Sequence, residues 1–145
     1  MTAVTGRTVV LVSCVSRKQP GPCKAKDLYC SSFFRKARAY AERVGDAWYI
    51  LSAEHGLLCP DTVIVDYDRT LNRMPIAERL AWADRVSRDL SRVIKPSDRV
   101  QVLAGSRYRE FVMPALRTLC AEVSVPMEGL TIGKQLQWLD TQGKP

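Results

Sequence analysis

With 145 residues, the chain is expected to fold as a single domain spanning residues 1–145. No apolar run approaches the ~20 residues that span a bilayer, and the N-terminus lacks the basic-then-apolar order of a signal peptide, so we expect a cytoplasmic protein without a membrane partner. Twenty-two Lys and Arg against fifteen Asp and Glu give a net charge of +7, which favours a phosphate-bearing partner, nucleic acid or nucleotide, although a merely basic soluble surface fits the same count.

Four apolar runs predict the strands of a sheet, namely Val9–Val12, Trp48–Leu51, Val100–Leu103 and Val123–Val125. The first run is continuously apolar and β-branched, which is typical of a central strand covered on both faces. A long loop rich in Pro and Gly follows it and carries Arg17, Lys18, Lys24 and Lys26. Such a basic loop could cradle a phosphate, although the spacing of a P-loop is absent.

A helix capped by Ser31 or Ser32 is expected next, ending at Gly45. Its basic residues lie mostly off the apolar stripe, which favours a solvated face over a DNA-contacting one; they are Arg35, Lys36, Arg38 and Arg43. After the second strand, a connection of roughly 20 residues runs from Glu54 to about Met74, and connections of this length are commonly functional or lid-like.

The second half of the chain predicts three more helices. One starts at Pro75 with an apolar stripe of Ile76, Leu80, Ala83, Val86, Leu90 and Val93, and Trp82 lies off the centre of that stripe. The next starts at Gly105-Ser106 and should kink or break at Pro114, and Thr131 caps the last. This alternation predicts an α/β fold, a three-layer α/β/α sandwich with a mainly parallel sheet of about four strands (Rossmann-like).

Polar residues follow the predicted strands, at the edge where open α/β sheets bind ligands. Those after the first two strands are Ser13, Cys14, Ser52, Glu54 and His55. His55 is the only histidine in the chain. An imidazole at this edge can move protons near neutral pH or hold a phosphate, although a histidine that only shapes the turn with Gly56 fits the same pattern.

Two further segments could complete a site at this edge. Asp68, within the polar segment 66–72, could act as a general base or stabilise a cationic sugar, but ordinary turn chemistry also explains such residues. Gly105, Ser106 and Arg107 open a helix after the third strand, where free N–H groups and a guanidinium suit an anion. Tyr67 and Tyr108 could stack on a base.

The cysteines support no metal site. Cys23, Cys30 and Cys59 with His55 match zinc spacings poorly, so we expect neither a metal nor a cofactor. Five cysteines without secretory context favour reduced thiols. Nucleophilic catalysis by Cys14 beside His55 is geometrically conceivable, but a small buried hydrophobe is the commoner fate of such a cysteine.

Several segments together resemble a family of small, mostly uncharacterised bacterial and phage domains related to the YaaA (peroxide-stress) group. They are 11–14 with Lys18, 27–31, 49–57, 67–71, 103–108 and 129–133. The resemblance implies an α/β core and a nucleic-acid or nucleotide context, because YaaA-like proteins are associated with DNA binding. A similar domain accompanies enzymes of archaeosine tRNA modification, and relatives have been likened in fold to glycosylases of the uracil-DNA type, whose usual motifs this chain lacks.

Two main hypotheses follow. The first is an enzyme, a hydrolase or transferase, acting on a nucleotide or on a base within nucleic acid, with the N-glycosidic bond as the expected point of attack. In it Ser13, Lys18 and Arg107 hold phosphate, and His55 with Asp68 or Glu54 performs acid/base work. The alternative is a non-catalytic DNA- or RNA-binding module related to YaaA, and a small-molecule sensor is a third. The sequence leaves open the oligomeric state and the choice between DNA, RNA and free nucleotide.

Overall fold

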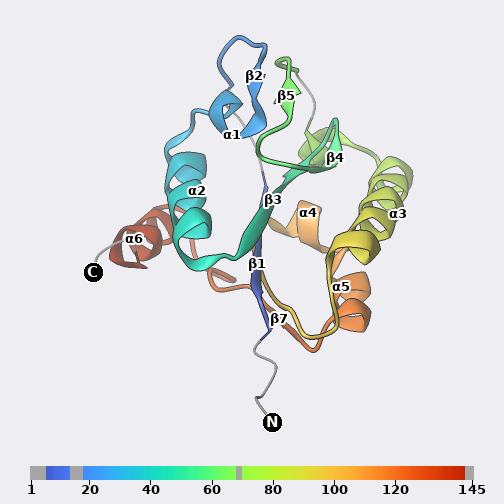
Figure 1. The fold of residues 1–145 in the computed structure, drawn as a ribbon. Coiled ribbons are helices and arrows are strands. Elements are labelled where there is room, and N and C mark those ends of the chain that lie inside the picture. The colour runs from blue at the N-terminus through green and yellow to red at the C-terminus, as the bar shows by residue number, and fades with distance from the viewer. Residues whose placement is uncertain (1–5, 14–17, 68–69, 143–145) are drawn as a thin grey trace.

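The computed structural model in Figure 1 describes residues 6–13, 18–67 and 70–142. Its strands are β1 (Thr8–Ser13), β2 (Cys23–Lys24), β3 (Ala47–Ser52), β4 (Gly56–Leu58), β5 (Val63–Ile64), β6 (Arg99–Leu103) and β7 (Glu122–Ser124). Its helices are α1 (Ala25–Leu28), α2 (Ser32–Val44), α3 (Ile76–Val93), α4 (Ser106–Arg109), α5 (Met113–Leu119) and α6 (Ile132–Gln142), with a 3₁₀ turn η1 (Leu71–Arg73). None of these helices is both long enough and apolar enough to cross a membrane.

The main sheet has five strands in the order β4-β3-β1-β6-β7. Strands β3, β1, β6 and β7 are parallel to one another, so the four predicted strands and their common direction are confirmed. The fifth strand, β4, pairs antiparallel with β3. Because the four parallel strands run the same way, their carboxyl ends meet at one edge of the sheet.

Helices pack against both faces of the sheet, as the alternating side chains of β1 show. Val9 and Leu11 belong to a core cluster with residues of α3 and α5. Val10 and Val12 belong to a second cluster with residues of α2 and α6. Figure 1 shows the same division, with α2 and α6 on one side of the sheet and α3 and α5 on the other. The protein is therefore a mixed α/β fold whose central strand is buried from Val9 to Ser13.

The helix ends follow local chemistry. Ser31 caps α2, as predicted, because its hydroxyl accepts a hydrogen bond from the peptide N–H of Phe34 at 3.1 Å. Pro114 lies in the first turn of α5, so the predicted break is confirmed, and it leaves α4 as a single turn. Pro75 is the residue before α3 rather than its first residue.

The predicted stripe of α3 is wrong at its first two turns. Ile76 and Leu80 are 58% and 47% exposed, whereas Arg79 and Trp82 are buried. Trp82 turns this part of the helix inward, because its indole packs in the core and its N–H finds an acceptor there. Farther along, Ala83, Val86 and Leu90 lie on the core side as predicted.

The connection expected as a long loop after β3 is also corrected. It contains β4, β5 and η1. Strand β5 pairs antiparallel with β2, with Cys23 opposite Ile64 and Lys24 opposite Val63. Figure 1 shows this two-stranded ribbon beyond the carboxyl ends of β1 and β3. Two connections therefore meet over the edge where the sequence predicts a site.

Candidate functional site

A tight hairpin presents the central residues of the site. Ser52 pairs with Gly56 across the three residues Ala53–His55. Gly56 has φ of +73°, and an added Cβ would lie 3.0 Å from the Arg85 side chain. A short hairpin loop closed by a glycine in the left-handed region is a common connection between antiparallel strands. This signal, two apolar runs around a short loop that ends in glycine, could have predicted β4 from sequence.

Replacing Gly56 with alanine should destabilise the protein by about 1–2 kcal/mol, because an L-residue is strained in the left-handed region. The free energy of unfolding in urea measures the change. Replacing Gly133 with alanine is the matched control, since an added Cβ there meets nothing within 4 Å. A loss at Gly56 no larger than at Gly133 would contradict the role assigned to this turn.

A chain of hydrogen bonds joins three segments at the end of β3. The Ser52 hydroxyl is buried; its oxygen accepts the peptide N–H of His55 at 3.0 Å and lies 2.8 Å from the phenol oxygen of Tyr67. That phenol lies 2.7 Å from the phenol of Tyr29. From the face of the sheet that α3 covers, the Trp82 indole N–H donates to the Ser52 carbonyl at 2.8 Å. The strand end is thus held in place by groups from two sides.

Cationic and aromatic groups surround Tyr67. The Lys18 ammonium lies 4.5 Å from the centre of the Tyr67 ring and 6.0 Å from that of Tyr29. The exposed His55 imidazole meets the Tyr67 ring edge-on, with ring centres 5.5 Å apart. An ammonium over an aromatic face is attracted by the ring quadrupole. The arrangement offers a positive charge, a proton-transfer group and an aromatic ring within one cluster.

The two-stranded ribbon explains how residues far apart in sequence form this cluster. Lys18 forms a backbone bridge to Tyr29 just before β2, and Tyr67 follows β5 closely. Further backbone hydrogen bonds join the segments next to the two strands of the ribbon. The peptide N–H groups of Ala25 and Lys26, which follow β2, donate to the carbonyls of Thr62 and Pro60, which precede β5. Tyr29 was not among the predicted site residues, although it lies within one of the segments that resemble the YaaA-like family.

The structure brings together only some of the predicted residues. Lys18, Ser52, His55 and Tyr67 form the cluster. Ser13 is buried at the end of β1, where it pairs with Leu51 of β3. Glu54 is half-buried in the hairpin, and its carbonyl accepts a hydrogen bond from Arg85 at 3.3 Å. Cys14 and Asp68 lie outside the described residues.

The residues after β6 depart further from expectation. Gly105, Ser106 and Arg107 are exposed at the edge, but α4 spans only four residues. So short a helix sums few peptide dipoles, which removes much of the reason for an anion at its N-terminus. Tyr108 is 2% exposed and packs edge-on against Trp82, with ring centres 5.7 Å apart. Its ring therefore belongs to the core, where it cannot stack on a ligand.

The strand order marks where a ligand would lie. The chain leaves β1 towards α2 on one face and leaves β6 towards α4 and α5 on the other, and β1 and β6 are neighbours. Where successive connections diverge in this way, the loops open a crevice at the carboxyl edge. Ser13 and Gly105 flank this point.

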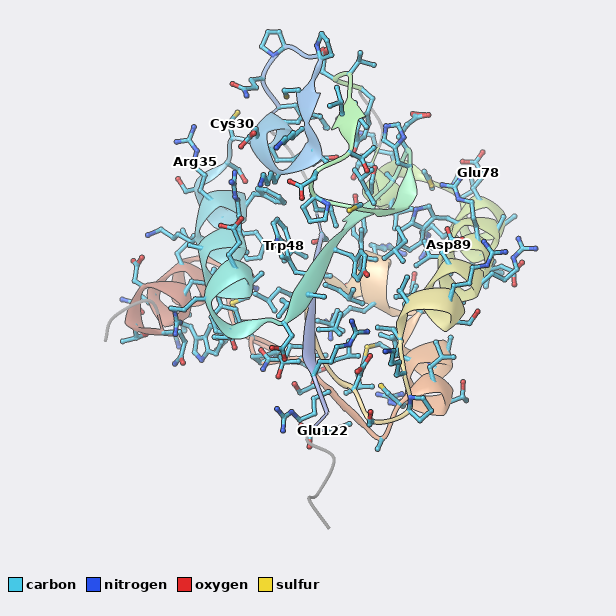
Figure 2. The ribbon with its side chains drawn as sticks, in the orientation of Figure 1. Cys30, Arg35, Trp48, Glu78, Asp89 and Glu122 are labelled. Atoms are coloured by element: carbon cyan, nitrogen blue, oxygen red, sulfur yellow. The ribbon has the colours of Figure 1, made fainter. Side chains whose placement is uncertain are left out.

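The basic residues of α2 are largely engaged by other parts of the protein. Lys36 pairs with Asp140 of α6, and Arg43 donates to the carbonyl of Gln142. Arg38 pairs with Asp27 at 2.8 Å and with Glu42 at 3.2 Å. Figure 2 shows Arg35 on the outer side of the helix. Most of this helix's charge thus serves packing and local pairing.

No group of three or more His, Cys, Asp or Glu in the described part of the chain could hold a metal ion. The four cysteines described there, Cys23, Cys30, Cys59 and Cys120, are free thiols. Burial raises the pKa of the Cys120 thiol, so this cysteine remains protonated in the core.

Comparison with known proteins gives two matches. The model of a family of unknown function, DUF6884, matches residues 9–141. The "Uncharacterized protein YfjM" of Bacillus subtilis (strain 168) is 30% identical over 143 residues, which cover 92% of this chain and 93% of that protein. No solved structure matches the chain. Neither match names the YaaA-like group.

Proposed function

The chain belongs to the family of unknown function DUF6884, and we propose from its site that it is an enzyme acting on a nucleotide, or on a base within nucleic acid, at the N-glycosidic bond. The observation that carries the proposal is the cluster of Lys18, Ser52, His55 and Tyr67 at the carboxyl edge. Its position beside the divergence of β1 and β6 is where sheets of this kind bind phosphorylated ligands. A three-layer, Rossmann-like classification of the fold and kinship with YaaA-like proteins form part of the same proposal.

Each group has a chemical task in this proposal. Tyr67 stacks on the base, a contact worth about 1–3 kcal/mol. Lys18 supplies positive charge to a phosphate on the near side of that base, and Ser13 and Arg107 flank the crevice. Ser52 is a positioning residue, since its hydroxyl is already shared between His55 and Tyr67. It sets the hairpin and the ring relative to each other.

The reaction needs two proton transfers, one to the leaving base and one from the attacking water. As the bond between C1′ and the base nitrogen breaks, the leaving base gains a proton and the attacking water loses one to a general base. We assign the proton transfer to the His55 imidazole, with the Glu54 carboxylate of the same hairpin as the second group. Asp68 retains its expected role as a stabiliser of positive charge on the sugar.

The alternative, a non-catalytic nucleic-acid-binding module, needs a continuous basic surface. The pairing of Lys36, Arg38 and Arg43 with groups of this chain weighs against such a surface on α2. We therefore place the enzyme first.

Calorimetric titration with the four common nucleoside 5′-monophosphates and with hexanucleotides of DNA and RNA tests the proposal. Lys18→Ala should weaken binding about tenfold, the effect of one charge-assisted phosphate contact. Lys95→Ala is the matched control, because Lys95 is exposed in the turn before β6, at the opposite edge of the sheet.

If the wild type and Lys18→Ala bound these ligands with equal affinity, the result would contradict the proposed binding site. If affinity instead fell steeply with salt while Lys18→Ala had no effect, the result would favour the binding module.

A further inference from the structure

A second feature of the carboxyl edge is a pocket of about 160 Å³ between the ends of β6 and β7. Its walls include Ala104, Gly105, Arg109, Val125, Glu128 and Gln135. A polar pocket of this size can hold ordered water or one small polar group. Added Cβ atoms at Gly105 and Gly129, which also line the pocket, would meet nothing within 4 Å, so its rim is open.

Arg109 gives this pocket its chemistry. Its side chain is 18% exposed, and one terminal nitrogen donates to Glu128 at 3.1 Å. Its Nε is buried and has no hydrogen-bond partner within the described ranges. Buried donors are almost always paired in folded proteins. A ligand with hydrogen-bond acceptors in the pocket would give this Nε–H a partner. The fork of donors on a guanidinium matches the oxygens of a phosphate.

The Glu128 carboxylate pairs with Arg109 in a way that allows a ligand to displace it. Its side chain is 69% exposed, so it returns to water easily once displaced. An exposed ion pair of this kind contributes little to stability. A phosphate brings more charge and more acceptor oxygens than a carboxylate does, so it competes well for the same arginine.

The position of the pocket fits the ligand proposed above. Strands β6 and β7 are two and three places from β3 in the sheet. With strands about 4.8 Å apart, the pocket lies roughly 10–14 Å along the edge from the end of β3. With a base stacked on Tyr67 and a first phosphate at Lys18, the edge above β1 and β6 leaves room for a second phosphate beside Arg109.

We infer that this pocket is a phosphate subsite in which Arg109 binds the phosphate and Glu128 is the carboxylate that the phosphate displaces. The inference rests on the proposed function, because it assigns the phosphate to the same ligand. This second phosphate belongs either to the phosphate chain of a free nucleotide or to a neighbouring position of a strand.

Two substitutions of opposite expected sign test the inference by calorimetry. Arg109→Gln should weaken binding about tenfold, whereas Glu128→Gln should tighten it about threefold by removing the competing charge. Arg117→Gln is the matched control, since Arg117 is exposed on α5. Thermal unfolding of each variant checks that the fold is retained. If the ion pair were purely structural, both substitutions would weaken ligand binding.

The probes are a nucleoside 5′-monophosphate, the corresponding 5′-diphosphate and a hexanucleotide. If the opposite effects occur with the diphosphate, the second phosphate is that of a free nucleotide; if they occur with the hexanucleotide alone, it belongs to a strand. Effects of equal sign, or none, overturn the inference, while a retained Lys18→Ala effect would leave the proposed function intact. Absence of binding by the wild type overturns both.

Discussion

Replacing His55 with alanine is expected to slow release of the base by about 10²–10⁴-fold, the usual contribution of a general acid or base. The fold should survive. His55 is exposed, and its link to Ser52 uses the peptide N–H, which alanine retains. Chromatographic detection of free base from whichever nucleotide or oligonucleotide binds measures the rate.

His55→Gln provides the second arm of this experiment. Glutamine keeps hydrogen-bonding groups at the position but cannot exchange a proton near neutral pH. Both variants should therefore lose turnover while they bind ligand within about twofold of the wild type. Turnover that survives in His55→Ala would remove the histidine from the chemistry and leave it as a residue of the turn.

Much of the fold could be predicted because the signals are local. The β-branched run of β1 and the serine cap of α2 are explained by residues within a few positions. The predicted apolar stripe of α3 was wrong at its first turns because a contact with a distant segment sets which side of the helix faces the core there. Trp82 donates to the carbonyl of Ser52, thirty residues earlier in the chain, and this contact turns Ile76 and Leu80 to solvent.

The candidate site was predictable only in part, for a related reason. Strand polarity placed Ser52 and His55 at the right edge, since parallel strands end together. The contact of Lys18 with Tyr67 depends on the ribbon of β2 and β5, two strands of two residues each. Pairing that short has no clear sequence pattern. Tyr108 shows the opposite error, because the break before Pro114 leaves one turn whose tyrosine faces the core.

The largest stability effect is expected at Asp98, in the turn between α3 and β6. Asp98 is 1% exposed and accepts hydrogen bonds from two nitrogens of Arg7, at 3.1 and 2.9 Å, and from the peptide N–H of Lys95 at 2.8 Å. The same guanidinium donates to the carbonyl of Val93 at 2.7 Å. The carboxylate thus fastens the segment before β1 to the end of α3 and the start of β6.

Asp98→Ala should lower the free energy of unfolding by about 3 kcal/mol, because it leaves a peptide donor and a guanidinium without their acceptor. Urea unfolding measures the change. The matched control is Asp89→Ala, since Asp89 lies on the outer side of α3 (Figure 2) and pairs with the exposed Arg92 at 3.5 Å. A surface pair of this kind contributes at most about 1 kcal/mol.

The pH dependence separates the charge from the packing at Asp98. Hydrogen bonding from Arg7 lowers the pKa of Asp98, and the same contact raises the pKa of Arg7. A carboxyl group with a lowered folded-state pKa stabilises the protein fully above its unfolded pKa of about 3.9. That stabilisation is lost as the pH falls through the lower folded value. The difference between wild type and Asp98→Ala should therefore be constant from pH 7 to about 5 and shrink below about 4; a difference that persists unchanged into strong acid would mean that the lost contribution is packing rather than charge.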